Sequence, residues 1–143
     1  MTESRIRSNI TYNQNILDEL YMEKSKIESQ LYELDLLRDK VSGLQQRFGD
    51  RQQHRQTMLQ RITHSTIQNK ILKTYYDGMK VLLSGTEFNS AYEGLSESKC
   101  KINREVEVLQ ESLGRCVDNI AYRKERCDYW RSQLASLLAE EGR

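Results

Sequence analysis

The sequence predicts an all-α protein built as a long antiparallel helical hairpin of the coiled-coil type. The 143 residues contain no proline, where average usage would give about seven in a chain of this length. Only 37% of residues are hydrophobic and 30% are charged, which suits long two-faced helices better than a thick globular core. Apolar residues recur with alternating steps of four and three, the repeat of helices that pack lengthwise.

The N-terminal part of the chain carries the first of these repeats, here called the N-terminal stripe. Its members are Ile10, Asn13, Leu17, Leu20, Lys24, Ile27, Leu31, Leu34, Arg38, Val41, Gln45 and Phe48. Most of them are apolar, which predicts a long helix that packs along another helix. Because Asn13, Lys24 and Arg38 are polar, we expect them to weaken the seam and to set register or partner choice.

The middle of the chain breaks this regularity at 49–50 and again at 83–87. Gly49-Asp50 predicts either a helix end followed by a new cap or a kink in one helix. Between residues 58 and 83 the apolar residues form two offset stripes, which predicts contacts with more than one neighbour. At 83–87, Gly85 gives a flexible point and Ser84 with Glu87 fits a capping box, so we place a helix start there.

The C-terminal part of the chain has the most regular repeat, here called the C-terminal stripe. Its members are Phe88, Tyr92, Leu95, Lys99, Ile102, Val106, Leu109, Leu113, Cys116, Ile120, Arg123, Cys127, Trp130, Leu134 and Leu137. We therefore expect a single helical domain over 1–143, with a first arm at about 5–82, a turn at 83–87 and a second arm at about 88–140. Three helices, broken at 49 and 85, are the alternative.

No residue pattern in the chain is typical of an active site. His54 and His64 lie in a polar stretch without converging partners, so we interpret them as solvated surface residues. The spacing of Cys100, Cys116 and Cys127 matches no zinc pattern, and we interpret all three as reduced thiols packed in or beside the core. The sequence thus favours a protein that is not an enzyme and has no cofactor or metal.

The charges of the chain nearly balance, with 22 basic and 21 acidic residues and a net charge of +1. Since no segment forms a strong field of one sign, we expect no nucleic-acid partner. No window is long and apolar enough for a membrane span. The first seven residues have no apolar run, so we expect no cleaved Sec signal. The expected location is the cytoplasm, with export by another route as the alternative.

Aromatic and arginine side chains near the turn and near the C-terminus form the predicted partner-binding surface. Such residues are enriched at the centre of protein interfaces, and Trp130 with Arg126 and Arg131 is the expected anchor. Ordinary packing between the two arms is the alternative interpretation of the same residues. The predicted residues are Tyr76, Met79, Leu83, Phe88, Tyr92, Tyr122, Arg126, Tyr129, Trp130 and Arg131.

The turn region also carries a resemblance to a known family. Leu83-Ser84-Gly85, followed by the aromatic residues Phe88 and Tyr92, resembles the W-x-G turn of the WXG-like small helical proteins of Gram-positive type VII secretion. The chain is most similar to the accessory partners of LXG polymorphic toxins. Leu83 stands where the family has Trp, and Gly85 matches the family's Gly. The family's Y-x-x-x-D/E export motif is absent from this sequence.

This resemblance implies a targeting factor or chaperone for a secreted LXG toxin. Its partner would be the helical N-terminal domain of the toxin, another small helical protein, or a second copy in a homodimer. A helical client would complete a bundle with the hairpin. One rival interpretation is a coiled-coil stalk of a type III or flagellar export ATPase, which should have its turn near mid-chain. Another is a structural coiled coil that associates only with itself.

Overall fold

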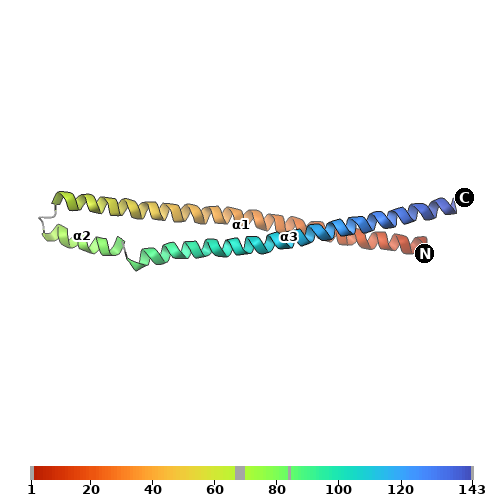
Figure 1. Cartoon of the computed structure of the whole chain (residues 1–143), viewed down its shortest axis with the longest axis horizontal. Helices are drawn as coiled ribbons and strands as arrows, with labels where there is room; N and C mark the ends of the chain where they lie inside the picture. The colour runs from red at the N-terminus through yellow and green to blue at the C-terminus, as the bar shows by residue number, and fades with distance from the viewer. Residues whose placement is uncertain (1, 67–69, 84, 143) are drawn as a thin grey trace. The chain divides into compact units, whose positions relative to one another are not determined.

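The computed structural model describes residues 2–66, 70–83 and 85–142 of the chain. These residues form three α-helices in the order α1 (Glu3–Thr66), α2 (Lys70–Leu83) and α3 (Thr86–Glu141) (Figure 1). The helices are 64, 14 and 56 residues long, and no strand occurs in the described ranges. The predicted all-α fold is therefore confirmed.

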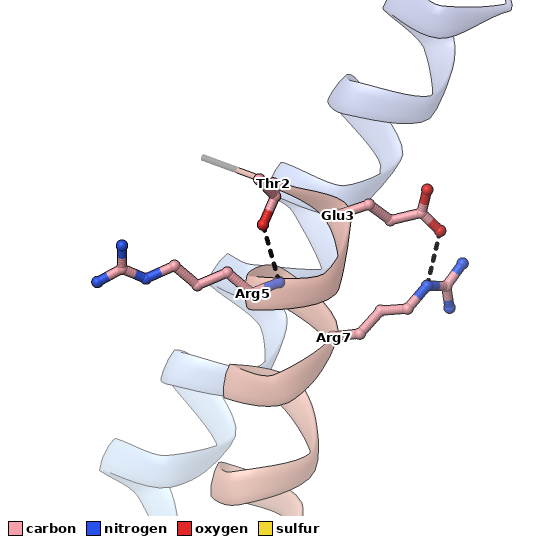
Figure 2. Close-up of polar contacts among 4 residues, drawn as sticks. All are labelled: Thr2, Glu3, Arg5 and Arg7. Carbon is pink, nitrogen blue, oxygen red and sulfur yellow. Dashed lines mark hydrogen bonds and ion pairs between the residues drawn. The ribbon is translucent and has the colours of Figure 1, made fainter.

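The first helix begins with a side-chain cap. The backbone N–H of Arg5 donates to the hydroxyl oxygen of Thr2 at 3.3 Å (Figure 2), which satisfies one of the amide groups that lack a partner at a helix start. One turn further, Arg7 Nε donates to Glu3 Oε1 at 2.8 Å. Glu3 also places negative charge at the positive end of the helix dipole. Local polar contacts thus fix where α1 begins.

The helices are organised in two compact units, and each is described by itself. Unit 1 consists of Met1–Glu33 and Val106–Arg143, and unit 2 consists of Leu34–Glu105. Unit 1 therefore takes segments from α1 and α3. Unit 2 contains the rest of these two helices and α2. Neither unit corresponds to one of the predicted arms, because each combines residues from both halves of the chain.

Unit 1 is a pair of antiparallel helix segments joined along the two predicted stripes. Every stripe member between Ile10 and Leu31, and between Val106 and Leu137, is buried or half-buried. The central cluster consists of Leu17, Leu20, Cys116, Ile120 and Cys127. Because the heptad positions face inward on both segments, the 4–3 repeat identified the packed faces of this unit correctly.

Unit 2 pairs α1 with the first part of α3 along the same stripes. Ile102 and Gln45 are buried, and Phe48 stacks on Phe88 with 4.8 Å between ring centroids and 13° between ring planes. Tyr92 lies 6.0 Å from Phe88, centroid to centroid, but remains 40% exposed. The C-terminal stripe is therefore less completely covered at this aromatic end than at Ile102.

The position of the chain reversal differs from the prediction. Phe48 faces Phe88 and Gln45 bonds Ser96, so α1 meets the start of α3 in antiparallel register. In unit 2, α2 and α3 follow one another on the side opposite α1 (Figure 1). The chain must therefore reverse between Thr66 and Lys70, and the predicted reversal at 83–87, with a first arm over 5–82, is wrong.

The region 83–87 is a helix boundary rather than the reversal. α2 ends at Leu83 and α3 begins at Thr86 with Glu87 in its first turn, so the predicted helix start is confirmed. Ser84, the other half of the predicted capping box, lies outside the described residues. The helices α2 and α3 therefore follow one another along the same side of unit 2.

Of the two alternatives predicted at 49–50, the helix end is wrong, because α1 is helical through Gly49 and Asp50; a kink within one helix stays a prediction. No described glycine has a positive φ, so no turn at Gly49 requires this residue. A Cβ atom placed there would lie 3.7 Å from Tyr92 Cε2, an ordinary contact. Gly49 is therefore a tolerated glycine within a helix that is held by packing on α3.

Only part of the broad apolar face predicted over 58–83 has described side chains. Leu59 is 7% exposed whereas Met58 is 46% exposed, so Leu59 marks the inward face of α1 there. On α2, Tyr76 and Met79 are half-buried while Tyr75 is exposed. The inward stripe of α2 therefore follows Tyr76 and Met79. Other predicted members, among them Ile62, Ile71 and Leu83, have side chains outside the described set.

Candidate functional site

Polar members of the two stripes pair with one another across the seam. In unit 1, Arg123 Nη1 donates to Asn13 Oδ1 at 3.0 Å, and Asn13 Nδ2 donates to the carbonyl of Asn9 at 2.8 Å. Asn13 is only 4% exposed, so both polar groups of its amide are satisfied inside the seam. This pairing explains how a buried Asn is accommodated, since unpaired buried amides are costly.

Unit 2 has a second set of polar contacts between the two helices. Gln45, which is 9% exposed, donates from Nε2 to the hydroxyl of Ser96, and its Oε1 accepts from Lys99 Nζ at 3.4 Å. Arg38 donates to Asn103 Oδ1 at 3.2 Å and also pairs with Asp35. Sliding the helices past each other would separate these partners, so the contacts favour one register in this unit.

The Asn13–Arg123 contact lies beside a group of aromatic rings in unit 1. The Arg123 guanidinium carbon is 5.7 Å from the centroid of the Tyr12 ring and 5.2 Å from that of Tyr122. Arg123 therefore bridges the two helix segments through its hydrogen bond to Asn13 and its cation–π contact with Tyr12, whereas Tyr122 lies on the same helix as Arg123. Neither Tyr12 nor Arg123 was in the predicted partner-binding set. The sequence signal that could have identified this contact was the presence of a polar residue in each apolar stripe, Asn13 in one and Arg123 in the other.

One turn further along α3 the same arrangement recurs around Arg126. Its guanidinium carbon lies 4.9 Å from the Tyr129 ring centroid and 5.5 Å from that of Trp130. The rings of Tyr129 and Trp130 meet edge to face, with centroids 5.1 Å apart and 74° between their planes. The structure thus brings together three predicted partner-binding residues, because positions three and four apart share one side of a helix.

We refer to these side chains together as the aromatic–arginine surface. It consists of Tyr12, Tyr122, Arg123, Arg126, Tyr129 and Trp130, all in unit 1. The three tyrosines are 60%, 54% and 46% exposed, although large aromatic side chains are usually more buried. Exposed rings fixed by neighbouring guanidinium groups are suited to anchor a partner, because little conformational freedom is lost on binding.

The other predicted partner-binding residues are elsewhere. Phe88 and Tyr92 stack in unit 2, and α2 of that unit carries Tyr76 and Met79. Arg131 belongs to unit 1 but makes different contacts from Arg126: it donates to Gln14 Oε1 at 3.2 Å and pairs with Asp128 at 3.9 Å. The predicted set therefore separates into two groups, and only the group in unit 1 includes exposed rings around arginines.

The three cysteines do not share one environment. Cys116 and Cys127 are 3% and 1% exposed, as predicted for core thiols. Burial raises the pKa of the Cys116 thiol, with the charge of Glu23 adding to the effect, and the thiol donates to the carbonyl of Leu20 at 3.2 Å. Cys100 is exposed, so its predicted packing with the core is wrong. Its position is one residue off the C-terminal stripe, which turns it to solvent.

No arrangement suited to covalent chemistry is found among the described residues. His54 is exposed, and the His64 side chain lies outside the described set. Within the described residues no group of three or more His, Cys, Asp or Glu side chains could hold a metal ion. A surface hollow near Thr11 is lined by α1 alone, and another near Cys100 is lined by α3 alone. Such open faces can bind a partner but do not enclose a small substrate.

None of the described helices has a stretch that is long and apolar enough to cross a membrane. The chain matches no protein-family model, no curated protein and no solved structure. The case for function therefore depends on the geometry of the aromatic–arginine surface and on the seam that holds it.

Proposed function

We propose that this protein is a non-enzymatic binding partner for a helical protein, and that the aromatic–arginine surface is where the partner docks. The observation that carries the proposal is the group of exposed rings held by Arg123 and Arg126 in unit 1. A seam made from two long stripes exposes the flanks of both helices, and a third helix can lie along such a flank.

The client that we propose is the helical N-terminal domain of a secreted LXG toxin, for which this chain acts as targeting factor or chaperone. Support for this client is the resemblance to the accessory partners of LXG toxins, in the layout of a proline-free helical hairpin. The match of Leu83-Ser84-Gly85 to a reversing W-x-G turn no longer contributes, since the chain reverses between α1 and α2. A cytoplasmic location before export fits this role and belongs to the same proposal.

One observation favours a second candidate, the coiled-coil stalk of an export ATPase. A stalk is expected to reverse near mid-chain between two nearly continuous helices. The reversal between Thr66 and Lys70, with 64 residues in α1 and 56 in α3, fits that expectation better than a reversal at 83–87 does. The two candidates differ in the protein that should bind and in the surface that should matter.

Co-purification with defined partners tests both candidates. The tagged chain is co-expressed with the N-terminal domain of an LXG toxin from the same genome and, separately, with the export ATPase of that genome. Tyr129→Ala should reduce recovery of the toxin domain at least tenfold. Tyr32→Ala is the matched control, because Tyr32 is a 66% exposed tyrosine of unit 1 outside the aromatic–arginine surface. Recovery of the ATPase alone would overturn the toxin proposal in favour of the stalk.

A further inference from the structure

The side of α3 that carries Tyr122, Arg126 and Tyr129 continues as a second 4–3 repeat, here called the outer stripe. Its members within unit 1 are Val108, Ser112, Arg115, Asn119, Tyr122, Arg126, Tyr129 and Gln133. All of them are exposed or half-buried in the structure. A 4–3 repeat follows the axis of a supercoiled helix, so a second helix can lie along this stripe lengthwise.

Charges are sorted unequally over α3 in unit 1. The outer stripe holds two arginines and no acidic residue, whereas Glu107, Glu111, Asp118, Glu125 and Asp128 all lie at other exposed positions. On α1, Glu23 is close enough to Cys116 to affect the pKa of its thiol, but Arg126 lies ten residues further along α3, roughly 15 Å away. The end of the outer stripe around Arg126 is thus positive without a neighbouring carboxylate on the same stripe.

The guanidinium of Arg126 has donors to spare. It lies on the rings of Tyr129 and Trp130. Arg126 belongs to none of the ion pairs shown for the described residues, which include those of Arg7, Lys24, Arg38 and Arg131. A guanidinium that stacks by its face keeps its in-plane N–H groups available, and these match the two oxygens of a carboxylate. The neighbouring rings of Tyr129 and Trp130 would reduce the exposure of such a pair to water.

From this geometry we infer that the aromatic–arginine surface accepts an acidic amphipathic helix of the client, with a carboxylate bound by Arg126. The inference deepens the proposed function and rests on it. The client helix lies along the outer stripe, places apolar side chains against Tyr122 and Tyr129, and carries Glu or Asp residues at the positions that face Arg115 and Arg126. Charge complementarity selects an acidic helix over a basic one.

Trp130 provides a direct measurement, because it is the chain's single tryptophan and contacts Arg126. The probe is a synthetic helical peptide of four heptads, with leucine along one face and glutamate beside it, and with no aromatic residue. A second peptide has lysine in place of every glutamate. Each is titrated into the full chain while Trp130 fluorescence is recorded at low and at physiological salt. The acidic peptide should bind at least tenfold more tightly, and its affinity should fall as salt increases.

Two variants of Arg126 and one of Arg131 distinguish this inference from nonspecific binding. Arg126→Gln should weaken binding of the acidic peptide at least tenfold, and Arg126→Lys should restore only part of it, because lysine lacks the planar fork. Arg131→Gln is the matched control, since Arg131 lies five residues further along α3 and bonds Gln14 instead, and it should change affinity less than twofold. Helical circular dichroism of each free variant confirms that it is folded.

Four results would overturn the inference. Equal binding of the acidic and basic peptides, or equal effects of Arg126→Gln and Arg131→Gln, would show that Arg126 does not select carboxylates. Absence of binding by the acidic peptide would also overturn the inference. In each of these cases the proposed function would stand if the toxin domain still co-purified with the chain. Sedimentation that showed a dimer broken by Arg126→Gln would assign the surface to a second copy of this chain instead.

Discussion

The buried contact between Asn13 and Arg123 leads to a quantitative prediction about the stability of unit 1. A double-mutant cycle with Asn13→Ala and Arg123→Ala should give a coupling energy of about 1.5 kcal/mol, the lower end of the range for hydrogen bonds to charged groups. Asn13 is buried, with 4% of its surface exposed. The lower end of the range applies because Arg123 is only half-buried, so its charge stays partly hydrated.

The same unit offers a matched pair in which the bond is exposed. Arg131 donates to Gln14 Oε1 at 3.2 Å, a length close to the 3.0 Å of the Arg123–Asn13 bond. A cycle with Gln14→Ala and Arg131→Ala should give about 0.5 kcal/mol or less, because exposed polar pairs contribute little. The difference between the two cycles isolates the effect of burial. Contacts that only one partner makes, such as Arg123 with Tyr12, cancel within a cycle.

Urea denaturation of the four members of each cycle supplies the measurement. Circular dichroism follows all helices, while Trp130 fluorescence reports on unit 1 alone, because the only tryptophan lies there. Unchanged denaturant slopes would show that the variants keep the same unfolding reaction. A coupling energy near zero for Asn13–Arg123, or equal values for the two pairs, would refute the argument that the seam contact fixes these helices to each other.

Three further predictions concern the thiols and a helical glycine. The free energy of unfolding of the wild type should fall relative to Cys116→Ala above about pH 8.5, the pKa of an unfolded thiol, by at most about 1.4 kcal/mol per pH unit. The sign follows because burial raises the Cys116 pKa, so the unfolded thiol loses its proton at lower pH than the folded one. Urea denaturation at several pH values measures this, and the same pH dependence of the free energy of unfolding in wild type and Cys116→Ala would contradict it. Gly114→Ala should raise the free energy of unfolding by about 0.5–1 kcal/mol, since a Cβ there meets nothing within 4 Å; a lower melting temperature would show that α3 needs the glycine. A thiol reagent should modify Cys100 rapidly in the native protein and Cys116 and Cys127 only after denaturation; three equal rates would contradict the packing of unit 1.

The packed faces could be predicted from the sequence because the heptad repeat reports burial directly. Leu17, Ile27 and Ile120 lie where the stripes place them, and even the polar Asn13 is buried because its position in the repeat faces the seam. Phe48 and Tyr92 are exceptions, since large rings at the end of a packed region can leave 36% and 40% of their surface exposed while each still contacts Phe88.

The reversal could not be found from turn signals. The breaks were predicted at Gly49 and Gly85 because glycine often ends a helix, whereas the segment from Thr66 to Lys70 contains neither glycine nor proline. Packing on a neighbouring helix outweighs the intrinsic cost of Gly49. A usable signal was present in the polar stripe members. Pairing Asn13 with Arg123 and Gln45 with Lys99 places the centre of symmetry near residues 68–72, which locates the reversal without any turn motif.

The aromatic–arginine surface could be predicted only in part for a related reason. Arg126, Tyr129 and Trp130 are neighbours on one helix, so helical spacing alone brings them together. Tyr12 and Arg123 meet only when the register between α1 and α3 is known. The register that the turn at 83–87 implied would have placed other residues of α1 beside Arg123. The error in the reversal thus left the contact between Tyr12 and Arg123 out of the prediction.

The assembly of unit 1 from two distant segments has a consequence for the order in which the chain can fold during synthesis. Unit 2 is one continuous stretch, Leu34–Glu105, so all of its contacts can form before the last part of α3 has been made. Residues before Leu34 must wait, since their partners begin at Val106 and the Gln14–Arg131 contact spans 117 positions. Closing such distant contacts is entropically costly for a free chain, but a paired unit 2 shortens the effective loop. The N-terminal segment, with Tyr12 unpaired, is then the part of the nascent protein that stays accessible longest.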